Sequence, residues 1–243
     1  MVILFIGHFR VSASNNNPSV DSLNLKNSQP RDSVTWGLTA LLHSESLYFF
    51  TGGVDQYDPS TDLIFVFDKG GWGGLIYKSL DLINHNTGIN YAMIVLHKHF
   101  YLGNNLLVTP NIGVNLNQNY SVADKGSDLM GDLAIAYKFG EHFVISNDAI
   151  FQNICITKDY NWTNRVKLLF KGADFDASAL VWDRNRLFNN PGYLSAGADI
   201  NYTGVKITSK TNLHLEASYI YTLQSDTHRV NGFMVSLGLD FGN

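Results

Sequence analysis

The sequence has few of the features that mark most soluble enzymes and helical membrane proteins. Among its 243 residues there is one cysteine, Cys155, so no internal disulfide can form and no cysteine-based metal site is expected. Charged residues make up 16% of the chain, against about 25% in typical soluble domains. No apolar run approaches the roughly 20 residues that a transmembrane helix needs. A disulfide-stabilised domain and a helical membrane protein are both disfavoured.

Basic clusters and common catalytic motifs are also missing from the sequence. Lys and Arg number 17 against 21 Asp and Glu, and the basic residues are scattered, which argues against a nucleic-acid partner. The sequence contains neither a glycine-rich phosphate loop nor a Gly-x-Ser-x-Gly elbow. We therefore predict no catalytic residues, no metal site and no cofactor, and an enzyme is the less favoured interpretation.

The sequence is instead rich in aromatic residues and in strands with two different faces. Aromatic residues make up 13% of the chain, and the last strand, residues 230–241, shows the alternation best. Because side chains of a strand point alternately to its two faces, one face is large and apolar and the other mostly small or polar. The apolar face holds Phe233, Val235, Leu237, Leu239 and Phe241, and the other holds Gly232, Met234, Ser236, Gly238 and Asp240.

Alternation alone does not show which face meets water. A soluble β-sandwich, jelly roll or lipocalin-like barrel also has one apolar face, which it turns toward its core. The second face of residues 230–241 carries Gly, Ser and Asp rather than the long charged side chains of a solvent face. That composition favours the crowded interior of a barrel whose apolar face is turned to lipid. The soluble β-barrel or jelly-roll ligand-binding protein remains an alternative.

This closing strand resembles the last strand of Gram-negative outer-membrane β-barrel proteins, which commonly ends on an aromatic residue. Here Phe241 is followed by Gly242 and Asn243. The resemblance covers a broad architecture and indicates no particular family within it. It implies an outer-membrane location, contact with the lipid bilayer and lipopolysaccharide, insertion by the barrel-assembly machinery, and small solutes as the remaining partners.

The connections between predicted strands alternate between short and long. Short turns are predicted at Gly103, Gly140, Gly172 and Gly204, which are 37, 32 and 32 residues apart. This rhythm is typical of an up-and-down barrel with short turns at one end and longer loops at the other. We predict an all-β fold, a closed antiparallel transmembrane barrel of about twelve strands, with ten as the alternative because residues 34–54 are ambiguous. Pro110, which has no N–H, predicts a local irregularity in its strand.

The first 32 residues differ from the rest. A short apolar run, Val2 to Ile6, precedes small residues near Ala13, and the following stretch is polar with Pro18 and Pro30. We interpret residues 1–32 as a weak or truncated signal segment followed by a flexible lead. Residues 33–243 are predicted to form a single barrel domain.

Polar and charged residues are predicted at inward positions of the strands. Such residues can fill a narrow lumen with a salt-bridge and hydrogen-bond network, or they can line a pore or ligand cavity. The predicted lumen-lining residues are Asn111, Asn115, Asp132, Lys138, Asp148, Arg165, Lys167, Asp176, Asp199, His214, Glu216 and Asp240. Lys98 is also predicted to point inward.

His97 and His99 lie two positions apart and therefore share one face of a strand. Such a pair can bind a metal ion, but a zinc site needs a third ligand that the sequence does not identify. The neighbouring Phe100 and Tyr101 favour an interfacial polar cluster at the level of an aromatic belt. Candidates for the aromatic belts are Trp36, Trp72, Trp162 and Trp182.

The function that the pattern favours is a narrow pore for passive transport, or a binding or structural role. The alternative is an outer-membrane lipid hydrolase or another barrel enzyme. Outer-membrane phospholipases use a Ser, a His and an Asn, and residues 79–86 do not resemble their motif. Omptin proteases use Asp and His pairs, which Asp81 with His85 or Asp226 with His228 could mimic. The residues considered for these chemistries are Ser79, Asp81, His85, Asn86, Asp226 and His228.

If the apolar faces meet lipid, the protein should sediment with membranes after mild lysis and should require detergent for extraction. Fractionation followed by immunoblotting measures this. Recovery in the soluble fraction without detergent would instead support the soluble barrel.

Overall fold

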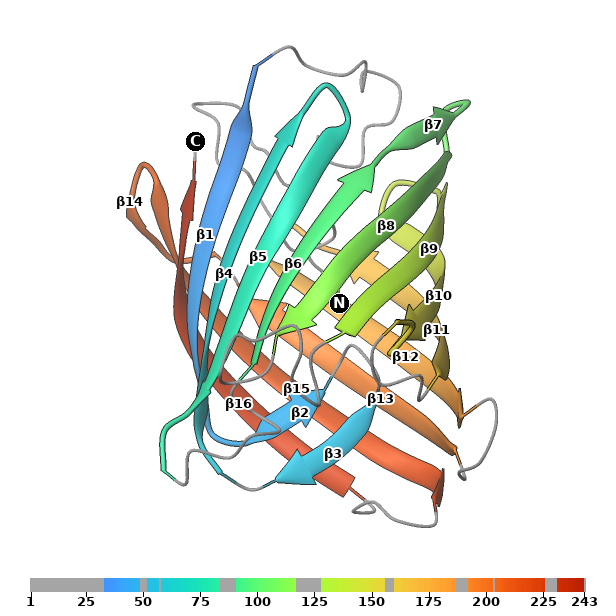
Figure 1. The fold of residues 1–243 in the computed structure, drawn as a ribbon. Coiled ribbons are helices and arrows are strands. Elements are labelled where there is room, and N and C mark those ends of the chain that lie inside the picture. Colours follow the sequence, from blue (N-terminus) through green and yellow to red (C-terminus); the bar gives the residue numbers. More distant parts are fainter. Residues whose placement is uncertain are drawn as a thin grey trace.

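The computed structural model of the chain describes residues 33–48, 52–56, 58–83, 91–116, 128–155, 160–186, 192–202, 204–225 and 231–242. These residues form a closed antiparallel β-barrel with twelve strands in its wall (Figure 1). Each wall strand pairs with the preceding and following wall strands, and the first pairs with the last. The predicted fold class and strand number are confirmed.

The wall strands are 8–15 residues long. They are β1 (Thr35–His43), β4 (Ser60–Lys69), β5 (Trp72–Asp81), β6 (Tyr91–Lys98), β8 (Leu106–Leu116), β9 (Asp128–Phe139), β10 (Phe143–Gln152), β11 (Asn161–Lys171), β12 (Phe175–Arg186), β13 (Tyr193–Tyr202), β15 (Thr211–Ser225) and β16 (Asn231–Gly242). Two shorter strands extend the wall: β7 (Phe100–Leu102) continues β6 along β8, and β14 (Lys206–Thr208) pairs with the start of β15.

The outside of the barrel is apolar and the inside is polar. In β16, Phe233, Val235 and Leu237 are about half exposed, whereas Ser236 between them is fully buried. Ile112 in β8 is 63% exposed. Large apolar side chains recur at outward positions around the wall, which is the reverse of a soluble core. A closed barrel satisfies its backbone groups within the wall, as a bilayer requires. The fold is therefore that of a transmembrane β-barrel.

The end of β16 is less exposed than its middle. Leu239 and Phe241 are only partly exposed, although they have the same parity as Phe233. They pair with Leu213 and Thr211 in β15, beside the hairpin in which β14 joins β15.

The short turns lie at one end of the barrel. Gly70, Gly71, Gly103 and Gly140 have φ between 61° and 77°, the left-handed region that glycine adopts without a steric cost. The C-terminal end of β16 lies at this same end, at the top of Figure 1, while the opposite end carries the longer connections. The predicted alternation of short and long connections is present in the structure.

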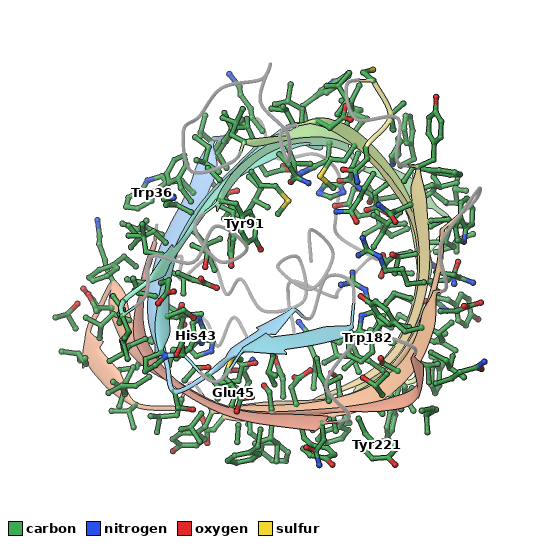
Figure 2. All side chains as sticks on the ribbon, turned by 60° about the horizontal axis from the view of Figure 1, so that its bottom comes forward. Trp36, His43, Glu45, Tyr91, Trp182 and Tyr221 are labelled. Carbon is green, nitrogen blue, oxygen red and sulfur yellow. The ribbon has the colours of Figure 1, made fainter. Side chains whose placement is uncertain are left out.

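The ambiguous stretch between residues 34 and 54 contributes one wall strand. Only β1 enters the barrel wall, and the chain then forms a separate hairpin of β2 (Ser46–Tyr48) and β3 (Gly53–Gln56). Viewed along the barrel, the hairpin lies inside the ring of wall strands (Figure 2). Leu47 holds it there by packing against Trp182, Leu180, Ile220 and Met234 on the inner wall.

The irregularity expected at Pro110 falls mainly on the neighbouring strand. The register between β8 and β9 runs through Pro110 without a shift. On the other side, β8 pairs with β6 up to His97 and with β7 from Phe100 onward, so the interruption lies directly opposite Pro110. The missing N–H of proline explains why the strand is interrupted there.

None of the described residues form a helix long and apolar enough to cross a membrane. The predicted signal segment and flexible lead, residues 1–32, lie outside the described residues.

Replacing Ile112 or Leu237 with Arg should destabilise the barrel in lipid by about 2–4 kcal/mol if the site is near the bilayer midplane, because a charge is then placed against hydrocarbon. Unfolding in urea from lipid vesicles measures the change. Leu102→Arg is the matched control, since this exposed residue lies at the short-turn end, where the cost should fall to about 0–1 kcal/mol. Equal effects at all three positions would show that these outward faces do not meet lipid.

Candidate functional site

The inner wall of the barrel carries the polar residues from which a functional site can be built. All twelve predicted lumen-lining residues lie at inward positions of their strands, alternating with the outward apolar residues. Asn111, Asp132, Asp148, Arg165, Lys167, Asp199 and His214 are buried, and Asn115, Lys138, Asp176, Glu216 and Asp240 are partly exposed. Whether these residues line a path for solutes stays a prediction.

A buried ion pair joins β10 to β11. Asp148 and Arg165 are directly opposite each other in the register, and both are at most 1% exposed. Arg165 donates from Nε and from Nη2 to the same carboxylate oxygen of Asp148, each at 2.7 Å. A charge buried on the inner wall needs such a partner, because the cost of its desolvation is otherwise uncompensated.

Other polar contacts join further neighbouring strands on the inner wall. The Asn111 amide donates to Asp132 at 2.9 Å, and the Ser178 hydroxyl donates to Asp199. Lys167 lies on the same face of β11 as Arg165 and is 4% exposed. Its ammonium group donates no hydrogen bond to any group in the described part of the chain.

A second network lies where β1 meets β4, around His43. The ring of His43 contacts the Ser236 hydroxyl through Nδ1 at 2.7 Å and the Asp62 carboxylate through Nε2 at 3.2 Å. Tyr77 donates its hydroxyl hydrogen to the same carboxylate at 2.7 Å. Asp62 is thus oriented from both sides by residues of β1 and β5.

The second network continues on β15 and β16. His214 lies between two carboxylates, 3.1 Å from Asp240 and 3.7 Å from Glu216. Thr39 donates to Asp240 at 2.7 Å and Ser218 donates to Glu216 at 2.6 Å. The seam where β1 closes on β16 is therefore lined by acidic side chains that imidazole and hydroxyl groups hold in place.

Charged residues of both signs lie on the inner wall. The inward residues of β11 include Arg165, Lys167 and Lys171. Five wall strands separate β11 from β4 in either direction, so these two strands face each other across the lumen. The inward face of β4 carries Asp62 and Asp68, and that of β5 carries Asp81. Asp148 on β10 and Asp199 on β13 lie near β11 as well, so its basic residues also have carboxylates on their own side of the lumen.

The β2–β3 hairpin is fitted closely to the inner wall. Gly52 lies in its turn with φ of 74°, and a Cβ atom there would be 2.4 Å from the indole ring of Trp182. Glycine is therefore needed at position 52 for two reasons: the positive φ of its backbone and the close approach of the Trp182 ring. Trp182 is fully buried and points inward (Figure 2).

Trp182 is a correction to the predicted aromatic belts. Trp36 and Trp72 are exposed on the outside, and Trp162 lies outward against Phe151 with ring centroids 4.2 Å apart. Trp182 instead anchors the hairpin. Its position could have been read from its parity, because it shares a face of β12 with Ser178 and Asp176.

The predicted inward orientation of Lys98 was wrong. Its ammonium group lies 4.8 Å from the ring centroid of Trp72, which is on the outside. His97 and His99, predicted to form an interfacial cluster, point inward and meet Asp68 of β4. The same face of β6 carries Met93 and Val95, which belong to an apolar cluster on the inner side of the wall. His97 therefore points inward and Lys98 outward.

The residues considered for hydrolase chemistry do not form a described site. Ser79 and Asp81 are buried at inward positions of β5, so Ser79 does not face lipid. His85, Asn86, Asp226 and His228 lie outside the described residues.

The architecture defines this chain as a transmembrane β-barrel with a charged inner wall. No protein-family profile matches the sequence, and no curated protein matches it. Among solved structures, the fold is similar to the KdgM porin, with a TM-score of 0.57 and 7% identity over 84% of this chain and 98% of that one. It is also similar to the NanC porin, with a TM-score of 0.54 and 10% identity over 85% of this chain and 98% of that one. At this identity the similarity establishes the fold.

Removing one partner of the buried ion pair should be costly. Asp148→Leu or Arg165→Met alone should destabilise the barrel by about 3–5 kcal/mol, because each leaves a buried charge uncompensated. The double variant should recover much of that loss. Urea unfolding in detergent or vesicles measures the coupling, and purely additive losses would show that the two side chains do not stabilise each other.

Proposed function

We propose that this protein is an outer-membrane barrel that forms a narrow, passive pore for small polar solutes. The observation that carries this proposal is the set of charged side chains of both signs on the inner wall. Basic residues of β11 face acidic residues of β4 and β5 across the lumen. Charged side chains that line a channel can attract polar solutes and select among ions.

A wall that only filled the barrel would be expected to neutralise its charges locally. The Asp148–Arg165 pair does so, but Lys167, two residues further along β11, has no hydrogen-bond acceptor in the described part of the chain. A charge held at a fixed position in a low-dielectric wall without a hydrogen-bonded partner attracts ions of opposite sign. The inner wall therefore suits the passage of ions or small charged solutes better than simple packing.

The hairpin favours a narrow path. Twelve strands lie between the small barrels that side chains fill and the 16–18-stranded porins with wide aqueous channels. The β2–β3 hairpin occupies part of the cross-section at the long-loop end, where Leu47 packs on the inner wall. The two structures of similar fold are both called porins, which fits this proposal.

The outer membrane is the proposed location because the outward apolar residues require lipid and the fold is that of porin structures. Contact with lipopolysaccharide and insertion by the barrel-assembly machinery follow from that location and are proposed with it.

The purified protein should give small stepwise currents in planar lipid bilayers. Replacing residues 46–56 with a short Gly-Ser linker should raise the single-channel conductance several-fold, because it removes the hairpin from the lumen. A lipid-hydrolysis assay on the same preparation tests the enzyme alternative. Silence in the bilayer with phospholipid turnover would favour a hydrolase, and silence in both would favour a binding or structural role.

Lys167→Gln should shift the ion selectivity of the pore toward cations, because it removes a positive charge from the inner wall. Reversal potentials in a salt gradient measure the shift. Lys206→Gln is the control, since Lys206 is exposed in β14 beyond the wall of the lumen. An equal shift in both variants would contradict the proposed path along β11.

A further inference from the structure

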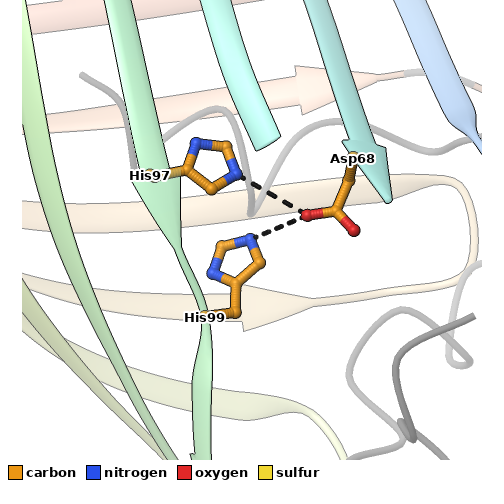
Figure 3. A group of neighbouring side chains, drawn as sticks. All are labelled: Asp68, His97 and His99. Carbon is orange, nitrogen blue, oxygen red and sulfur yellow. Dashed lines mark ion pairs between the residues drawn. The ribbon is translucent and has the colours of Figure 1, made fainter. Parts of the chain in front are cut away.

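Three side chains converge on the inner wall near the short-turn end of the barrel: Asp68 from β4 and His97 and His99 from the junction of β6 and β7 (Figure 3). We propose that this cluster is a binding site for a divalent transition-metal ion, with Zn²⁺ as the best match. The proposal stands on the geometry of the cluster and does not depend on whether the barrel conducts solutes.

The backbone brings these residues together across a strand that lies between them. Asp68 pairs with Gly73 of β5, and Gly73 pairs with His97 of β6, so the three residues form one row across the sheet. A Cβ atom at Gly73 would lie 2.4 Å from His97 Nε2. The glycine thus leaves the space through which the imidazole reaches over β5 to the carboxylate.

The donor atoms have nearly the spacing of a metal site. Oδ2 of Asp68 lies 3.7 Å from His97 Nε2 and 3.5 Å from His99 Nε2, and one ligand atom from each residue lies within 4.8 Å of the others. In a tetrahedral zinc site with bonds of about 2.0–2.2 Å, two ligand atoms are roughly 3.3–3.5 Å apart. The Asp68 distances need to change by only a few tenths of an ångström, and the two imidazole rings must rotate so that their ligand nitrogens approach by about 1 Å.

Hydrogen bonding leaves the correct atoms free to coordinate. His99 Nδ1 lies 2.9 Å from the hydroxyl of Thr109, a residue that is 1% exposed. When this nitrogen donates to Thr109, the lone pair of Nε2 points toward Asp68, which is the arrangement in which metal-binding histidines are usually held. Neither ring nitrogen of His97 makes a hydrogen bond within the described part of the chain.

The other inward histidines have different surroundings. His214 is one imidazole between two carboxylates, and His43 is one imidazole between Asp62 and Ser236. In each case one imidazole is accounted for by the carboxylate or hydroxyl groups beside it. At Asp68, two imidazoles with ring centroids 4.5 Å apart face one carboxylate, and one imidazolium would already neutralise it. A shared cation explains why the second ring is there.

The ligand set selects the metal. Two imidazole nitrogens and one carboxylate oxygen suit Zn²⁺, Cu²⁺ or Ni²⁺ better than Mg²⁺ or Ca²⁺, which prefer oxygen ligands. Three protein ligands leave a fourth position for water or a solute group on the lumen side. The ion would also link β4 to the β6–β7 junction, where Pro110 interrupts the ladder.

Isothermal titration of the full chain in detergent with Zn²⁺, and with Co²⁺ as a spectroscopic probe, tests the site. One Zn²⁺ per barrel is expected, with the strong visible absorption of four-coordinate Co²⁺. Asp68→Asn, His97→Gln and His99→Gln should each weaken binding at least about tenfold, and Thr109→Val, which removes the hydroxyl behind His99, should weaken it about 10–100-fold. Zn²⁺ should raise the unfolding temperature of the unaltered protein and not that of His97→Gln.

His142→Gln is the matched control, because His142 is exposed in the β9–β10 turn outside the cluster. It should bind Zn²⁺ like the unaltered protein. Heat-modifiable migration in gels shows whether each variant is folded. One folded variant among Asp68→Asn, His97→Gln and His99→Gln is enough to test the proposal. If the unaltered protein does not bind Zn²⁺, the proposal is overturned and the cluster is an ion pair. Binding that survives His97→Gln, or that is lost with His142→Gln, would overturn the proposal as well.

Discussion

The structure depends on the requirement that every backbone N–H and C=O in lipid finds a partner within the protein. Pairing of β1 with β16 closes the wall and removes both sheet edges. Once the wall is closed, period-two alternation gives each strand one lipid-facing row and one inward row. Pro110 shows how strict the requirement is, because one missing donor coincides with the interruption between β6 and β7.

The inner wall must accommodate charge at low dielectric, and it does so in two ways. On one side Asp148 and Arg165 compensate each other directly, and near the closing seam His43 and His214 contact carboxylates. On β11, Lys167 is held without a hydrogen-bond acceptor among the described residues. The first arrangement stabilises the wall, and the second leaves an ammonium group on the inner wall on which the proposed ion selectivity depends.

The outer face of the barrel was predictable, since Phe233, Val235 and Leu237 alternate with small and polar residues. Which face of β6 points inward could not be predicted, because both of its faces are apolar. Met93 and Val95 lie inside, and Ile94 and Leu96 lie outside. Period two separates the faces of a strand but does not say which is inner. The sequence showed the His97–His99 pair but not its inward orientation, for this reason, and not its third member, because Asp68 is brought to His97 only by the register across Gly73. The hairpin likewise depends on long-range contacts of Leu47.

The central claim is that one set of strand faces meets lipid and the other meets a polar interior. Fluorescence of single-tryptophan variants in vesicles of chain-brominated lipid tests it most directly, with the other three tryptophans replaced by Phe. Trp36 and Trp72 are exposed on the outside, whereas Trp182 is fully buried on the inside. The structure predicts strong quenching of Trp36 or Trp72 and little quenching of Trp182. Equal quenching of the inner and outer tryptophans would contradict the assignment of faces.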